Sequence, residues 1–143
     1  MTISLDRKEI QGILPHRNPF LFVDAVTEIE EEKRIVGELR VDDTVRFLRT
    51  AGDDATLPPT LLAEAMAQVG AILVLYPEEN RGRPIFFRAI DQCTFERPVP
   101  AGATLRIEAT VRKMRARFGS LSVTAELDGS RVASAVMSFA LGG

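Results

Sequence analysis

The sequence predicts an α+β protein in which one antiparallel sheet curls around a single long helix. Two observations lead to this prediction. The first is the order of the expected elements, which is a short helix, two strands, a long helix and four more strands. The second is segment 60–76, where apolar side chains occupy nearly every helical face, as expected for a helix surrounded by other elements. A curled sheet surrounds such a helix most simply, and because its edge strands need a partner, we expect a dimer that joins two sheets.

The first half of the chain contains one weak helix and two strands. The expected elements are a helix over about 6–13, strands over 20–30 and 35–41, and an irregular stretch over 42–56. Ser4 or Asp6 can cap the helix, which should stop before Pro15. The acidic run 30–33 is a polar turn between the strands.

The second half begins with the long helix over 60–76. The Pro58-Pro59 pair suits a helix start, and Pro77 ends it. Gly102 and Gly119 mark two of the breaks that follow, and Asp128-Gly129 is a strong hairpin signal. The four expected strands run over about 83–95, 103–115, 119–127 and 131–140. One sheet wrapped around one helix in this way is the hot-dog arrangement.

Composition limits the class of protein. The 143 residues are expected to form a single domain, 1–143, and 45% hydrophobic content is enough for a sizeable core. With one cysteine, Cys93, and one histidine, an internal disulfide and a Cys/His zinc cluster are excluded. A charged N-terminus and the lack of an 18-residue apolar run argue against a signal peptide and a membrane span. We therefore expect a soluble, cytoplasmic protein.

Charge is unevenly distributed along the chain. Residues 1–80 carry a net charge of −7, residues 81–117 carry +6 and residues 118–143 carry −1. The basic segment is either a set of solvated strand positions or a surface that steers an acidic partner. It has neither interleaved aromatic residues nor a basic helix, so nucleic acid is not an expected partner.

Two polar residues interrupt the apolar surface of the long helix beyond its first turn. Glu64 and Gln68 are four residues apart, so they lie on one face, one turn from each other. Burial of a carboxylate is costly unless it is hydrogen-bonded, and burial favours general acid or base chemistry. We expect Glu64 to be a buried functional group. The alternative is a structural glutamate that bonds to the backbone or to Gln68.

The single histidine, His16, lies in the proline-flanked segment LPHRNPF at 14–20. Prolines on both sides predict a rigid turn. A lone histidine in such a turn is more often a hydrogen-bonded structural residue than a base. Both interpretations stay open at this point.

Three segments resemble the 3-hydroxyacyl-acyl-carrier-protein dehydratases of fatty-acid synthesis. They are LPHRNPFLFVDAV at 14–26, LLAEAMAQVGAIL at 61–73 and FFRAIDQCTFERPVPAGATL at 86–105. The resemblance implies a hot-dog dimer, or a trimer of dimers, that removes water from a 3-hydroxyacyl thioester without a cofactor or metal. It also implies an acyl tunnel between protomers and an acyl carrier protein or coenzyme A as the carrier of the substrate.

The resemblance assigns the catalytic acid to Glu64 and shows departures at two other positions. The family's histidine position, fourteen residues earlier, is occupied by Thr50. The family's glycine, whose N–H binds the thioester carbonyl, is replaced by Pro59, which has no N–H to donate. Thr60 can still donate its own N–H, and His16 is the one imidazole that could replace the missing base. We expect these residues and Gln68 to surround the substrate.

Three functions stay open on the sequence. The first is a dehydratase with an altered site, in which Glu64 and His16 are the candidate catalytic residues. The second is an acyl-thioester hydrolase that uses Glu64. The third is a non-catalytic acyl-binding subunit in a heterodimer with a complete dehydratase subunit. In each case Arg88 and Arg97 of the basic segment are expected to line the approach of an acidic carrier protein.

Overall fold

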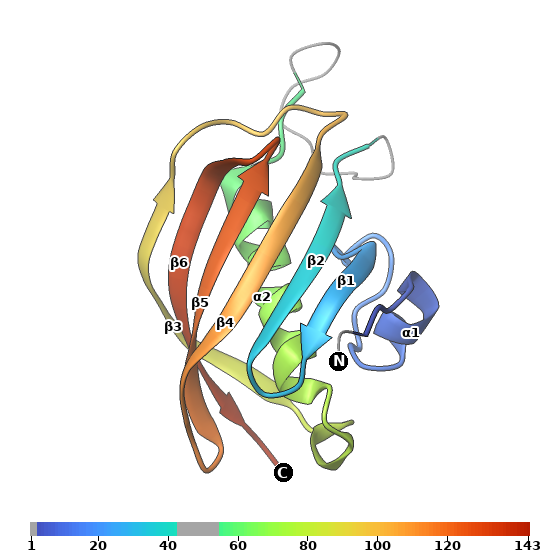
Figure 1. Cartoon of the computed structure of the whole chain (residues 1–143), viewed down its shortest axis with the longest axis vertical. Helices are drawn as coiled ribbons and strands as arrows, with labels where there is room; N and C mark the ends of the chain where they lie inside the picture. The colour runs from blue at the N-terminus through green and yellow to red at the C-terminus, as the bar shows by residue number, and fades with distance from the viewer. Residues whose placement is uncertain (1–2, 43–54) are drawn as a thin grey trace.

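The computed structural model describes residues 3–42 and 55–143. It contains a six-stranded antiparallel sheet that curls around a long helix (Figure 1). The elements are α1 (Arg7–Gln11), β1 (Ala25–Glu30), β2 (Arg34–Arg40), α2 (Pro59–Leu75), the 3-10 helix η2 (Glu78–Asn80), β3 (Ile85–Phe95), β4 (Thr104–Arg115), β5 (Phe118–Leu127) and β6 (Ser130–Leu141). The strand order is β1-β2-β4-β5-β6-β3, which leaves β1 and β3 at the edges. The predicted α+β hot-dog fold is confirmed.

The short helix α1 begins at one of the two predicted caps. Glu9 N–H donates to Asp6 Oδ1 at 2.8 Å, and Asp6 N–H donates to Glu9 Oε1 at 3.1 Å. These reciprocal bonds form a capping box, which makes Asp6 rather than Ser4 the N-cap. The helix ends at Gln11, slightly before the predicted end.

The predicted strand breaks at Gly102, just before Gly119 and at Asp128-Gly129 are confirmed. Asp128 and Gly129 have φ values of 52° and 81°, which is the backbone of a two-residue hairpin turn between β5 and β6. The break before Gly119 falls at Ala116, which has a φ of 54°, and Gly119 is the second residue of β5. Gly119 is needed for packing, since a Cβ there would lie 2.7 Å from Phe139 Cζ.

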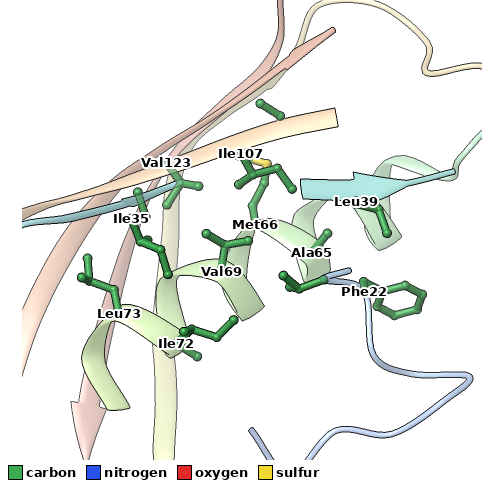
Figure 2. Close-up of a cluster of buried hydrophobic side chains, with 14 of the residues drawn as sticks. Phe22, Ile35, Leu39, Ala65, Met66, Val69, Ile72, Leu73, Ile107 and Val123 are labelled. Carbon is green, nitrogen blue, oxygen red and sulfur yellow. The ribbon is translucent and has the colours of Figure 1, made fainter. Parts of the chain in front are cut away.

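The core lies between α2 and the inner face of the sheet. Met66, Val69 and Leu73 of α2 point toward Ile35 of β2 and Ile107 of β4 (Figure 2). All five side chains are 0 or 1% exposed. This face of the helix is covered as its composition predicts.

The opposite face of α2 is not covered by the chain itself. Thr60 and Glu64 are exposed, and Leu61, Ala63 and Ala67 are only partly buried. The prediction that α2 is buried on all sides is therefore wrong for the single chain. One curled sheet of six strands covers only part of the circumference of the N-terminal half of the helix.

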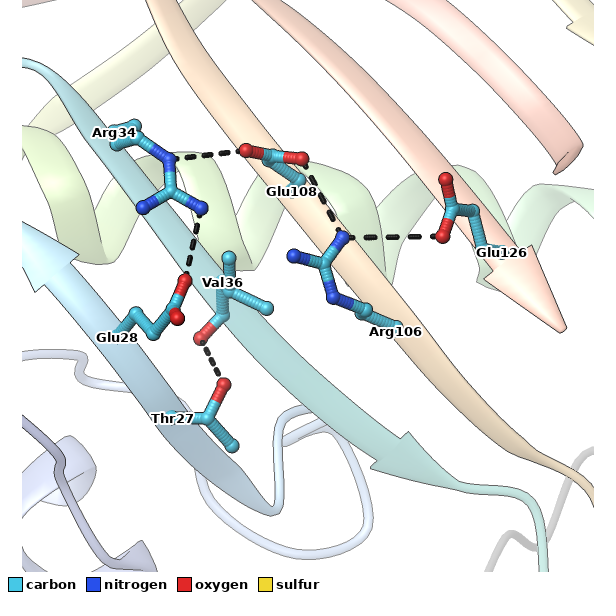
Figure 3. A network of polar contacts seen from close by, with 7 residues as sticks. All are labelled: Thr27, Glu28, Arg34, Val36, Arg106, Glu108 and Glu126. Atoms are coloured by element: carbon cyan, nitrogen blue, oxygen red, sulfur yellow. Dashed lines mark hydrogen bonds and ion pairs between the residues drawn. The ribbon is translucent and has the colours of Figure 1, made fainter. Parts of the chain in front are cut away.

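A row of charged side chains crosses the outer face of the sheet. Arg34 of β2 contacts Glu28 of β1 at 2.9 Å and Glu108 of β4 at 3.0 Å (Figure 3). Arg106 of β4 lies 3.4 Å from Glu108 and 3.8 Å from Glu126 of β5. The hydrogen bonds to Glu28 and Glu108 raise the pKa of Arg34 above its ordinary value. The row links four strands through partly exposed pairs, each of which contributes modestly.

Candidate functional site

A cavity of about 330 Å³ lies between the open face of α2 and the inner side of β3. Its residues on α2 follow a spacing of three and four, which places them on one helical face. Three of them are alanines, Ala63, Ala67 and Ala71, so short side chains leave the space unfilled. The complete lining is His16, Thr60, Ala63, Glu64, Ala67, Gln68, Ala71, Ile85, Phe87 and Ile90.

Gln68 is the buried polar residue that organises this cavity. Its side chain is 1% exposed. Gln68 Oε1 accepts from Phe22 N–H at 2.8 Å, and Gln68 Nε2 donates to Phe20 O at 2.8 Å and to Glu64 Oε2 at 3.2 Å. One amide therefore links the 14–22 loop to α2 and orients the carboxylate. Because the loop uses its backbone groups for these bonds, β1 begins at Ala25 rather than near residue 20.

Glu64 is the one carboxylate among the described residues that line the cavity. Its side chain is exposed in the single chain, which contradicts the expectation of a buried carboxylate. The reason is its place on the open face of α2, at the mouth of the apolar cavity. Gln68 nevertheless holds one carboxylate oxygen, so the other is available to a bound molecule.

His16 lies in the 14–22 loop and lines the same cavity as Glu64. The loop is fixed by Arg17, whose guanidinium donates to Leu14 O at 2.9 Å and to Gln11 O at 3.0 Å. The His16 ring is partly buried, and its Nδ1 is fully buried without a hydrogen-bond partner among the described residues. The structural interpretation of this histidine, as a ring held by hydrogen bonds, is therefore not supported.

The two arginines expected at the carrier approach lie apart. Arg88 of β3 stacks over the Phe118 ring with 5.4 Å to its centroid, and Arg117 lies 5.9 Å from the same centroid. Arg97, beyond the other end of β3, donates to Leu127 O at 3.2 Å. Nine residues of extended chain correspond to roughly 30 Å, so the structure does not bring Arg88 and Arg97 together.

Comparisons with known proteins show the family to which this chain belongs. A model of the FabA-like domain matches residues 14–136. A 3-hydroxyacyl-[acyl-carrier-protein] dehydratase FabZ of Bacillus cytotoxicus is 44% identical over 139 residues, which cover 96% of each chain. The FabZ of Bacillus licheniformis is 43% identical with the same coverage. The chain belongs to the FabA/FabZ dehydratase family.

Solved structures share the fold of this family member at low identity. The dehydratase heterocomplex ApeI:P of Xenorhabdus doucetiae matches with a TM-score of 0.82 and 16% identity, over 94% of this chain and 91% of that chain. Cj0977 of Campylobacter jejuni, described as a sigma28-regulated virulence protein, matches with a TM-score of 0.69 and 16% identity over 94% and 87% of the two chains. At these identities the likeness shows the hot-dog fold alone.

The two positions at which the resemblance implies departures, 50 and 59, fall before α2 and at its start. Pro59 is the first residue of α2 and contributes no N–H. The next residue, Thr60, is exposed and lines the cavity, and its N–H is one of the first-turn groups that a helix leaves unpaired. Thr50 lies outside the described residues.

The sequence did not predict the hydrophobic wall of the cavity. Ile85, Phe87 and Ile90 of β3 line it, opposite the alanines of α2. The alternation of Ile85 and Phe87 indicates an inward face, but nothing in the sequence shows that this face covers the site. Among the described residues no group of three His, Cys, Asp or Glu could hold a metal ion, and no helix is long and apolar enough to cross a membrane.

Proposed function

We propose that this chain binds 3-hydroxyacyl thioesters in the cavity between α2 and β3 and takes part in their dehydration to trans-2-enoyl thioesters. The observation that carries the proposal is the Glu64 carboxylate, held by Gln68 at the mouth of an apolar cavity. The FabZ names of relatives at 44% and 43% identity support the substrate class.

The reaction needs a base that acts at C2 of the acyl group and an acid that acts at the hydroxyl on C3. A base removes a proton from C2, the C2=C3 double bond forms, and the C3–O bond breaks. Glu64 serves as the general acid that gives a proton to the departing hydroxyl, which leaves as water. The apolar walls from Ile85, Phe87 and Ile90 would hold the acyl chain and exclude bulk water.

The source of the base is the point at which this chain differs from its family. Position 50 is a threonine, which cannot serve as an imidazole does, and His16 is the chain's single histidine. A homodimer would repeat the same composition. A second candidate function is therefore an acyl-binding subunit of a heteromeric dehydratase, in which a complete dehydratase subunit supplies the missing histidine.

The edge strand β3 is the proposed place for the second subunit, whether identical or related. Phe86, Ile90 and Phe95 are 59%, 46% and 41% exposed along it. An unpaired apolar edge of this length favours pairing with another strand. Ile90→Asp should convert a dimer to a monomer in light scattering at micromolar concentration, and a dimer that persists would place the contact elsewhere.

One set of assays separates the candidate functions. The purified chain is incubated with 3-hydroxyacyl, enoyl and saturated acyl thioesters, while the enoyl absorbance band and thiol release are followed. Glu64→Gln should lower dehydration or hydration by about 100-fold or more. The matched variant Glu79→Gln, which removes the same charge from the exposed helix η2, should not. Thiol release that depends on Glu64 would instead identify a hydrolase, and an equal rate in Glu64→Gln would remove Glu64 from catalysis.

A complementation assay tests the heteromeric function. The chain is mixed with a complete dehydratase from the same organism whose own catalytic glutamate has been changed to glutamine. Activity in the mixture then requires Glu64 from this chain and the histidine from the other. Activity that does not return, with both chains folded and associated, would count against a shared site.

The carrier of the substrate is proposed to be an acidic carrier protein that meets the basic segment. Arg88 and Arg117 flank the exposed ring of Phe118, and Arg97 lies at the other end of β3. Arg88→Glu and Arg97→Glu, made separately, should slow association with acyl carrier protein at low salt. Unchanged association rates in both variants would leave these arginines as solvated strand positions.

A further inference from the structure

The unpaired Nδ1 of His16 requires an explanation, because buried polar atoms without a partner are rare in folded proteins. Arg17 and Gln68 fix the backbone of the 14–22 loop on both sides of His16, so the position from which the ring projects is set by the loop. Since Nδ1 is shut off from solvent while the ring lines the cavity, Nε2 is the ring atom that can meet a bound molecule.

The burial of Nδ1 also selects a tautomer. Neutral imidazole carries one N–H donor and one bare acceptor nitrogen. A buried N–H without an acceptor is rarer, and costs more free energy, than a buried acceptor without a donor. The proton therefore belongs on Nε2, where it points to the cavity, and Nδ1 carries the lone pair.

This tautomer is unsuited to a base at the cavity. To accept a proton there, Nε2 would have to be bare, which would place the N–H at buried Nδ1 with no acceptor among the described residues. A neutral imidazole with its N–H directed at the substrate is instead an electrophile, which stabilises negative charge that develops on a carbonyl oxygen.

We propose that His16 is a hydrogen-bond donor to the thioester carbonyl of the bound acyl group, through Nε2–H, and is not the base of the reaction. The inference rests on the proposed function and deepens it. It gives this chain a carbonyl donor where Pro59, at the start of α2, has removed the N–H of the family's glycine. His16 then acts beside Glu64 in the same cavity, and the base comes from another subunit.

Two variants of His16 separate a donor from a base. In His16→Gln the side-chain amide can place an N–H near the position of Nε2 but cannot accept a proton, and His16→Phe removes the donor while keeping a ring. A donor role predicts that His16→Gln loses less than about tenfold in kcat/KM and His16→Phe loses about 100-fold or more. Equal large losses in both variants would identify a base and overturn the proposal, as would no loss in either. Circular dichroism confirms that each variant is folded.

Nitrogen NMR of the ring gives a readout that does not depend on activity. Because the chain has one histidine, tag-free protein labelled with ¹⁵N-histidine gives the signals of His16 alone. We expect the Nε2–H tautomer in the free protein, and a shift of this N–H when a 3-hydroxyacyl pantetheine amide, which cannot be hydrolysed as a thioester, is added. The Nδ1–H tautomer, or an imidazolium at the assay pH, would overturn the inference.

Failure of the proposed function leaves a different signature. If the wild-type chain neither binds the amide nor turns over any acyl thioester, alone or in the complementation mixture, the proposed function fails whatever the tautomer. If turnover is seen and the tautomer is Nδ1–H, only the role of His16 fails. When the chain binds the amide but has no measurable rate, the NMR experiment alone decides.

Discussion

Replacement of Gln68 by methionine tests the link between the 14–22 loop and the central helix. Methionine is unbranched, has a similar helix propensity and fills a similar volume, so the change removes hydrogen bonds with little change in packing. The bonds removed are those with Phe22 N–H, Phe20 O and Glu64 Oε2. The expected result is a loss of stability together with a less ordered carboxylate.

The size of the expected loss in stability follows from how deeply each hydrogen-bond partner of Gln68 is buried. Phe22 is 3% exposed, so its N–H loses its acceptor out of reach of water, which costs about 1–3 kcal/mol. Phe20 is 59% exposed, so its carbonyl can be hydrated and only the net value of one bond, about 0.5–1.5 kcal/mol, is lost. The sum is about 1.5–4.5 kcal/mol, or roughly 5–18 °C in Tm for a chain of this size.

The assay is urea unfolding followed by circular dichroism at one fixed protein concentration. Gln11→Met is the matched control, because Gln11 ends helix α1 and its side chain makes no hydrogen bond to the described residues. It should change the free energy of unfolding by less than about 0.5 kcal/mol. If Gln68→Met also changes the free energy of unfolding by less than about 0.5 kcal/mol, the reasoning is refuted. That result would mean that the Phe22 N–H finds another partner at no cost.

Three further predictions concern the cavity, a turn and the charged row. Ala71→Leu places a larger side chain in the cavity wall and should shift kcat/KM toward shorter acyl chains, whereas an unchanged chain-length profile would mean that the acyl group does not reach Ala71. Gly119→Ala puts a Cβ 2.7 Å from Lys113 O and should lower the free energy of unfolding by about 1–3 kcal/mol in urea, and a neutral result would show that the β4–β5 hairpin can relax. Arg34→Met removes the shared partner of Glu28 and Glu108, and it should lower the free energy of unfolding by up to about 1 kcal/mol at low salt and by less at 1 M salt. A loss that does not depend on salt would indicate that the stem of the arginine contributes through packing instead.

Local signals in the sequence predicted most of the elements correctly. Asp6 with Glu9, the Pro58-Pro59 pair and Asp128-Gly129 each act through backbone groups a few residues away, so their effect can be read from neighbours alone. Gly119 correctly marked the break between β4 and β5, but the need for a glycine there comes from packing. Its lack of a side chain leaves room for the ring of Phe139, a residue twenty positions later, and for the backbone carbonyl of Lys113 on the paired strand.

The sequence by itself determined the fold and the chemical types at the site. Glu64 and Gln68 share a face because they are four residues apart on a helix, and Thr50 and Pro59 stand where the resemblance implies a histidine and a glycine. Only the tertiary structure decided how these groups are used. It left Glu64 exposed on the side of α2 that the sheet does not cover, and it gave Gln68 partners 46 and 48 residues away. It also closed Nδ1 of His16 away from every acceptor among the described residues. Such outcomes depend on which surfaces meet when the sheet curls, and no spacing along the chain encodes them.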